Sequence, residues 1–133
     1  MMDLQIDKAV AEIRARHANI VGLQMPEGLK TRAREMASRL EQVTGCQVII
    51  LGDPCYGACD LRSFQGLDLL VHVGHAPMPD LVPDLPTVFL EVRMDFDVCK
   101  GLLESRDRIA ERVGLVATVQ HLHLLPRAEQ VLR

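Results

Sequence analysis

The strongest constraint on the fold of this chain is an unbroken apolar run at Asp68–Gly74, which reads Asp-Leu-Leu-Val-His-Val-Gly. Such a run is typical of a strand buried on both faces of a parallel sheet. Strand-like segments are expected at 19–25, 46–51, 68–74, 87–92 and 115–120. Helix-like segments separate them, at 3–17, 29–43, 97–112 and 122–132. Because parallel strands need crossover connections, this alternation predicts the α/β class, with a parallel sheet flanked by helices.

Local signals set several element boundaries. Asp3 is a candidate N-cap for the first helix, and Gly45 is a candidate C-terminal cap for the second. Three prolines, at 77, 79 and 83, predict a loop over residues 76–86. These signals leave each strand followed by a short loop at its carboxyl end.

Composition excludes several classes of protein. The 133 residues are 48% hydrophobic and 25% charged, which suits one globular domain that buries roughly two-thirds of its surface. Tyr56 is the single tyrosine, tryptophan is absent and the net charge is -3, so no direct nucleic-acid partner is expected. No apolar run reaches the roughly 18 residues of a membrane helix, and no basic, apolar leader opens the chain. We therefore expect a cytoplasmic protein with no membrane partner and with its four cysteines reduced.

Two of these cysteines, Cys55 and Cys59, lie in the loop Gly52–Asp60, directly after the run 46–51, which we interpret as a buried strand. They are candidates for metal or cluster ligands, for a redox pair, or for a nucleophile and a spectator. Three intervening residues weaken the redox-pair interpretation, because a thioredoxin-type dithiol has two. Arg62 has the wrong spacing for a phosphatase-like nucleophile. A polar turn at a strand end is a poor place for an inert thiol, so we favour ligands.

Histidines follow the next strand and could complete a zinc site. His72 lies inside the apolar run, where we expect a packed, hydrogen-bonded side chain, whereas His75 follows the strand and is expected to face the cleft. His121 and His123 occupy the corresponding end of the last expected strand. Zinc needs four ligands in a structural site, so this set is possible but loosely specified.

The remaining polar candidates have structural explanations. Asp53 precedes a proline in a turn, and Asp60 is a plausible helix N-cap. Gly28 could free backbone N–H groups for an anion at a helix start, but no dinucleotide or P-loop motif is present. Cys46 and Cys99 are expected to be core residues.

Four segments, taken together, resemble the diphthamide-synthesis family, in its archaeal-type 2-(3-amino-3-carboxypropyl)histidine synthase form. They are Leu-Gln-Met-Pro-Glu-Gly-Leu at 23–29, Gly-Asp-Pro-Cys-Tyr-Gly-Ala-Cys-Asp at 52–60, Val-His-Val-Gly-His-Ala at 71–76 and Val-Gln-His-Leu-His at 119–123. The resemblance covers the N-terminal part of the family, from about residue 20 of this chain to its end.

The resemblance implies a transferase that uses S-adenosylmethionine and a 4Fe-4S cluster. Such an enzyme moves a 3-amino-3-carboxypropyl group, as a radical, to a histidine of translation elongation factor 2. It also implies three related α/β units, each giving one cysteine to the cluster, and the matching position here is Cys59. Cys55 would be a neighbour of the cluster. A homodimer in the full-length form and an electron donor are further expected partners.

On this basis residues 1–113 form the first α/β unit, and residues 114–133 are the opening strand and helix of an incomplete second unit. We expect the other two cluster cysteines to lie outside this chain, which would make it a fragment, a truncated product or half of a split enzyme. The alternative function is a non-catalytic zinc-binding or scaffold module that uses Cys55, Cys59 and His75, with His72 as a possible further ligand.

Overall fold

The computed structural model describes residues 2–61 and 65–133, which form two compact units. The larger unit is Leu4–Val92, and the smaller one joins the first three residues to Arg93–Arg133. Each unit is described by itself below.

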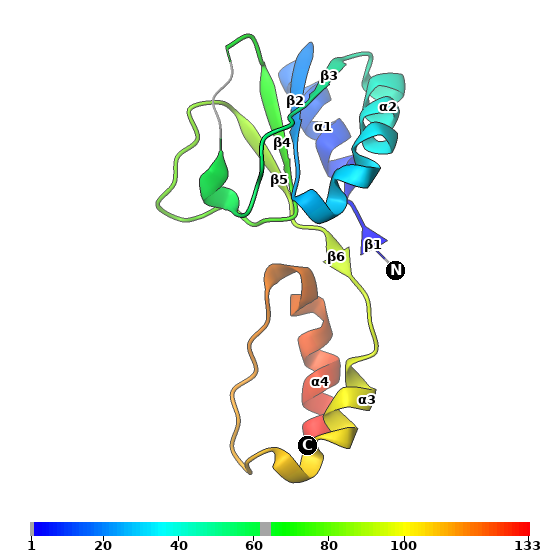
Figure 1. The fold of residues 1–133 in the computed structure, drawn as a ribbon, viewed down its shortest axis with the longest axis vertical. Helices are drawn as coiled ribbons and strands as arrows, with labels where there is room; N and C mark the ends of the chain where they lie inside the picture. The colour runs from blue at the N-terminus through cyan, green and yellow to red at the C-terminus, as the bar shows by residue number, and fades with distance from the viewer. Residues whose placement is uncertain (1, 62–64) are drawn as a thin grey trace. The chain divides into compact units, whose positions relative to one another are not determined.

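The larger unit is built on a parallel sheet of four strands (Figure 1). The strands are β2 (Ile20–Gln24), β3 (Gln47–Ile50), β4 (Leu69–Val73) and β5 (Thr87–Leu90), in the spatial order β3-β2-β4-β5. All three neighbouring pairs run parallel. This arrangement confirms the predicted α/β class, with a parallel sheet flanked by helices.

The position of a strand in the sheet decides how deeply it is buried. All five residues of β4 are buried, as its unbroken apolar run predicts. The run 46–51 was expected to be a buried strand, and this is wrong for β3, because Ile49 and Ile50 are 42% and 43% exposed. The physical reason is that β3 lies at an edge of this sheet, next to β2 alone.

The first helix, α1 (Ile6–Arg16), buries Ala9 and Ile13 and contacts β5. The prediction that Asp3 is the N-cap of this helix is wrong. Asp3 instead belongs to a short strand, and the helix follows Gln5, whose φ of 53° turns the chain into the first helical residue.

The second helix starts later than the sequence pattern indicates. Residues Glu27–Arg32 form a 3₁₀ helix, η1, and the α-helix α2 covers Ala33–Thr44. The predicted cap is confirmed, since Gly45 has a φ of 77° and its N–H donates to the carbonyl of Glu41. Helix α2 packs on β3 and on α1.

The smaller unit is mainly helical. Its elements are β1 (Met2–Asp3), β6 (Arg93–Met94), α3 (Val98–Glu104), the 3₁₀ helices η3 (Arg106–Arg108) and η4 (Val119–Leu124), and α4 (Leu125–Leu132). Strands β1 and β6 pair antiparallel, and α3 packs on α4. No helix in the described part of the chain is long and apolar enough to span a membrane.

The strand expected at 115–120 is not formed. Residues 115–118 are irregular, and η4 begins at Val119 and leads directly into α4. Leu115 and Ala117 line an apolar hollow of about 530 Å³ together with residues of α3 and α4. Helical neighbours offer no free strand edge, so this apolar segment has nothing to pair with as a strand. The assignment of 114–133 to a second family unit stays a prediction.

Candidate metal centre

The candidate site lies at the carboxyl ends of β2 and β4. These neighbouring strands are in register, with Gln24 beside His72. From β2 the chain crosses to β3 on one side, and β4 lies on the other, so the order of the strands reverses here. In open α/β sheets the crevice at such a switch point is the usual place for a ligand.

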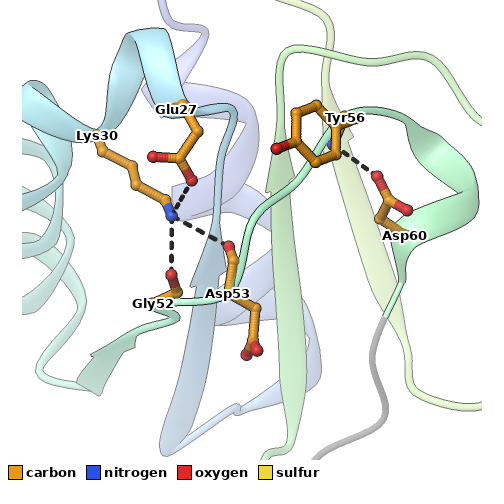
Figure 2. Close-up of polar contacts among 6 residues, drawn as sticks. All are labelled: Glu27, Lys30, Gly52, Asp53, Tyr56 and Asp60. Atoms are coloured by element: carbon orange, nitrogen blue, oxygen red, sulfur yellow. Dashed lines mark hydrogen bonds and ion pairs between the residues drawn. The ribbon is translucent and has the colours of Figure 1, made fainter.

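Lys30 of η1 holds the start of the cysteine loop. Its Nζ donates to the backbone carbonyls of Gly52, at 2.9 Å, and Asp53, at 3.1 Å (Figure 2). The same amine pairs with the carboxylate of Glu27. A negative charge therefore already stands at the start of η1, where the sequence suggested that the N–H groups near Gly28 could receive an anion.

Asp60 holds the other end of the loop. Its carboxylate accepts hydrogen bonds from the backbone N–H groups of Tyr56 and Gly57 (Figure 2 shows the first). The prediction that Asp60 is a helix N-cap is wrong, because Asp60 is the last residue of the 3₁₀ helix η2 (Ala58–Asp60). From that position the Asp60 carboxylate accepts the two loop N–H groups, and these hydrogen bonds close residues 56–60 into a tight turn.

The two thiols of the loop differ sharply in exposure. The side chain of Cys55 is buried, with 1% exposed, whereas Cys59 is exposed. Burial raises the pKa of the Cys55 thiol, and the negative charge of Asp60 raises it further. Cys55 is therefore a protonated thiol at neutral pH.

Cys59 has open space beside it. A Cβ built at Gly57 would lie 3.3 Å from the Cys59 Sγ, so glycine at position 57 keeps the sulfur uncrowded. The thiol borders a hollow of about 100 Å³. The other residues of its wall are Leu61, Leu70, Leu81, Val82, Pro83, Asp84, Leu85 and Thr87. Cys59 is therefore an accessible thiol at the edge of a hollow.

A chain of hydrogen bonds runs behind the loop. Gln24 Nε2 donates to the Asp60 carbonyl at 2.8 Å, and Gln24 Oε1 lies 2.9 Å from His72 Nδ1. His72 Nε2 lies 2.9 Å from His75 Nδ1. Burial lowers the pKa of His72 to about 4, with a further decrease from His75, so His72 is neutral at pH 7. The expectation of a packed, hydrogen-bonded His72 is confirmed.

His75 is half-buried, and burial also lowers its pKa, against the opposing effects of the Asp60 charge and the Tyr56 carbonyl. Gly74 sets its position, with a φ of 94° that places a turn between the two histidines. A Cβ at Gly74 would lie 2.8 Å from Pro26 Cγ, so only glycine fits this close approach.

Cys55, His72 and His75 come together as possible metal ligands. One ligand atom from each lies within 4.8 Å of the others. The zinc alternative predicts Cys55, Cys59 and His75 as ligands, with His72 as a further one. The structure groups both histidines with Cys55, and Cys59 is not in this group.

The other two cysteines have their own partners. Cys46 is buried and accepts a hydrogen bond from Thr44 Oγ1 at 3.1 Å, which confirms it as a core residue. Cys99 is half-buried in α3, where Arg127 Nε donates to its sulfur at 3.1 Å, so the prediction that it is a core residue is wrong.

His121 and His123 belong to the smaller unit, on η4 and not at a strand end. His123 Nε2 lies 2.8 Å from an Asp95 carboxylate oxygen, and this hydrogen bond lowers the pKa of Asp95. His121 packs edge-on against the ring of Phe96. Both histidines thus have partners within their own unit.

The sequence missed Gln24 and Lys30. Gln24 ends the first predicted strand as a buried polar residue, 1% exposed, and its role depends on the register with β4. The chain is thus an α/β protein of the open parallel-sheet class, with thiol and imidazole side chains grouped at the carboxyl ends of its strands.

Within this class the chain belongs to the diphthamide synthesis protein family, whose profile matches residues 25–133. It is 34% identical to 2-(3-amino-3-carboxypropyl)histidine synthase subunit 1 of Mus musculus, over 98% of this chain and 32% of that protein. It is 33% identical to the 2-(3-amino-3-carboxypropyl)histidine synthase of Pyrococcus horikoshii, over 91% of this chain and 37% of that protein. The chain thus spans about a third of the length of these curated relatives.

Solved structures agree with this assignment. The crystal structure of Dph2 from Pyrococcus horikoshii matches with a TM-score of 0.87 and 30% identity, over 99% of this chain and 41% of that one. A second structure of the same protein, with a 4Fe-4S cluster, matches with a TM-score of 0.88.

Proposed function

We propose that this chain forms part of a 2-(3-amino-3-carboxypropyl)histidine synthase, a transferase of diphthamide biosynthesis. In this proposal the transferred group comes from S-adenosylmethionine and goes to a histidine of translation elongation factor 2. The observation that carries the proposal is the exposed Cys59 thiol, on a strand-end loop of a chain that belongs to the family. Radical chemistry, an electron donor, a full-length homodimer and a cytoplasmic location are parts of the same proposal and rest on the family resemblance.

Cys59 fits the requirements of one ligand of a 4Fe-4S cluster. Thiolates are the usual ligands of such clusters, which supply one-electron chemistry when bound. Cys59 is the only exposed thiol among the four cysteines, all of which lie in the described part of the chain. The uncrowded sulfur and the adjoining hollow leave room for a bulky inorganic group.

The neighbouring residues hold Cys59 in place. Asp60 fixes the turn that contains it through two backbone hydrogen bonds, and Lys30 fixes the start of the loop. Gln24 ties the Asp60 carbonyl to the sheet. Anchoring at both ends reduces the conformations open to the loop, which favours a ligand thiol held in one position.

The test is anaerobic reconstitution, with iron and sulfide, of a parent chain extended by the further units that the resemblance implies, because these 133 residues supply one of the three expected cluster cysteines. Variants Cys59→Ala and Cys99→Ala are compared, because Cys99 lies in the other compact unit and serves as a matched control. We expect the visible absorption of an iron-sulfur cluster in the parent chain and in Cys99→Ala, and its loss in Cys59→Ala.

The same samples are then incubated with S-adenosylmethionine, a reductant and elongation factor 2. Mass spectrometry of the factor shows whether one 3-amino-3-carboxypropyl group has been added to a histidine. Equal cluster content in Cys59→Ala and the parent chain, or no cluster in any sample, would contradict the proposal.

A further inference from the structure

Cys55 and the two histidines are not used by the proposed cluster site. Their ligand atoms lie within 4.8 Å of one another, at the switch point of the sheet. We propose that Cys55, His72 and His75 bind one divalent metal ion of the zinc type, in a site separate from the Cys59 thiol. This inference does not depend on the proposed transferase activity.

The spacing of the ligands suits a small ion. With zinc–nitrogen bonds of about 2.0 Å and a zinc–sulfur bond of about 2.3 Å, ligands in a tetrahedral site lie roughly 3.3–3.6 Å apart. The facing nitrogens of His72 and His75 are 2.9 Å apart, so an ion needs only a small separation of the rings. Cys55 lies within reach of both nitrogens.

Hydrogen bonds to Gln24 set the protonation of His72. The Asp60 carbonyl can only accept, so the Gln24 group that faces it is the NH₂ group, and Oε1 faces His72. His72 Nδ1 must therefore carry the proton and donate it to Gln24. Because His72 is neutral, its Nε2 has a free electron pair, directed toward His75.

This arrangement is the one that a metal-bound histidine requires. A histidine ligand generally donates its other ring N–H to a carbonyl or carboxylate, which orients the ring and fixes the tautomer. Here Gln24 Oε1 already performs that function for His72. In the metal-free chain the free pair of His72 Nε2 accepts the Nδ1 proton of His75.

When a metal ion binds, it takes the place of the His75 Nδ1 proton that lies between the two histidines. The His75 proton moves from Nδ1 to Nε2, which frees Nδ1 as a ligand and leaves the imidazole neutral. Cys55 loses its thiol proton to solvent and binds as a thiolate. One proton is released in total, and the ion gains two neutral nitrogens and one anionic sulfur.

The charges around the site favour a cation. The negative Asp60 acts on all three groups, raising the pKa of Cys55, His72 and His75. Lys30 opposes it, but only at Cys55, and there with a smaller effect than Asp60. The charge of Asp60 therefore favours a divalent ion at this position.

Burial defines how open the site is. Cys55 and His72 are 1% and 0% exposed, while His75 is half-buried and forms the side nearer to solvent. Within residues 2–61 and 65–133 the site has three ligands, and the fourth position is left for water or another small ligand. An open fourth position is typical of zinc sites that do more than stabilise a fold.

Cobalt(II) is the probe that tests this site, because a cobalt–thiolate bond gives a charge-transfer band and a tetrahedral cobalt ion gives visible bands. The metal-free 133-residue chain is titrated with Co²⁺, and Zn²⁺ is then added as a competitor. We expect one Co²⁺ per chain with both sets of bands, and their loss when Zn²⁺ displaces it.

Variants identify the ligands. Cys55→Ser should abolish the charge-transfer band, and His75→Gln should weaken binding by roughly 100-fold or more while the thiolate band persists at high Co²⁺. Gln24→Leu removes only the partner of the His72 ring, and we expect about a 10- to 100-fold loss of affinity. Far-UV circular dichroism confirms that each variant is folded.

Matched controls are Cys59→Ser, in the same loop, and His17→Gln, which removes an exposed histidine. Both should bind Co²⁺ like the parent chain. The inference is wrong if the parent chain shows no thiolate band, if Cys59→Ser removes it, or if Cys55→Ser leaves it unchanged. None of these results bears on the cluster at Cys59, which is measured separately with iron and sulfide.

Discussion

The two ends of the cysteine loop offer different chemistry from similar sequence. At one end Cys55 is buried beside two histidines, and its thiol has a raised pKa. At the other end Cys59 is exposed beside a hollow, with glycine at position 57 keeping its sulfur uncrowded. The difference teaches that two cysteines close in sequence need not form one site, because three intervening residues here separate a buried thiol from an exposed one.

The largest expected effect comes from placing a charge at each end. Cys55→Asp puts a carboxylate in a buried position near Asp60, and we expect it to cost roughly 3 kcal/mol or more of the free energy of unfolding. Cys59→Asp places the same group at an exposed position, where the change should stay within about 0.5 kcal/mol. Urea unfolding at pH 7 measures both, and equal losses would show that the two ends are equally buried.

The stability of the chain should depend on pH through the buried end of the loop and not through the exposed end. The pKa of His72 is about 4 in the folded chain, below the 6.5 of a free histidine, so the unfolded chain binds more protons between these values. The contribution of neutral His72 to the free energy of unfolding is complete above about pH 6.5 and is lost as the pH falls toward 4. The loss is about 2 kcal/mol at pH 5. Unfolding of the metal-free chain at pH 7 and pH 5 tests this. His72→Gln should flatten the change, whereas Cys59→Ser should leave it intact.

Asp60 and Lys30, which hold the loop, should contribute differently to the free energy of unfolding. Asp60→Ala removes an acceptor of two backbone N–H groups, and we expect a loss of about 1–2 kcal/mol together with faster hydrogen exchange at Tyr56 and Gly57. Asp53→Ala changes an exposed carboxylate in the same loop and should have little effect. Unchanged exchange at both amides in Asp60→Ala would show that the turn holds without this carboxylate.

Lys30 should give the smallest effect. Lys30→Met keeps most of the apolar stem but removes the hydrogen bonds to Gly52 and Asp53, with an expected loss of about 0.5–1 kcal/mol. Exchange should increase for the start of the loop and not around Asp60. Thermal unfolding and residue-resolved exchange measure this, and equal increases at both ends would mean that the loop moves as one piece.

Much of the sheet could be predicted from the sequence. The apolar run of β4 is long enough to identify a central strand without further information. The exposure of β3 could not be predicted, because an edge position depends on the order of strands in space and not on the local pattern. The strand predicted at 115–120 is wrong for a similar reason, since a strand forms only where another strand offers a free edge.

The candidate ligands could be proposed from the sequence, but their grouping could not. Cys55, Cys59 and His75 were found because they follow strands, and strand ends meet at one edge of a parallel sheet. That both histidines join Cys55 depends on the turn at Gly74 and on the register between β2 and β4. The anchoring by Lys30 has no local signal, because a flexible side chain reaches the loop from a distant part of the chain.

The most direct test of the account measures two spectra on the same set of proteins: the parent chain, Cys55→Ala, Cys59→Ala and Cys99→Ala. Each protein is made in two lengths: the extended form gives the iron-sulfur absorption after anaerobic reconstitution, and the 133-residue chain gives the cobalt–thiolate absorption after Co²⁺ addition. We expect crossed losses, with Cys59→Ala losing the cluster and keeping the cobalt band, Cys55→Ala doing the reverse, and Cys99→Ala keeping both. Loss of both signals in either loop variant, with the fold intact, would contradict the separation of the two thiols.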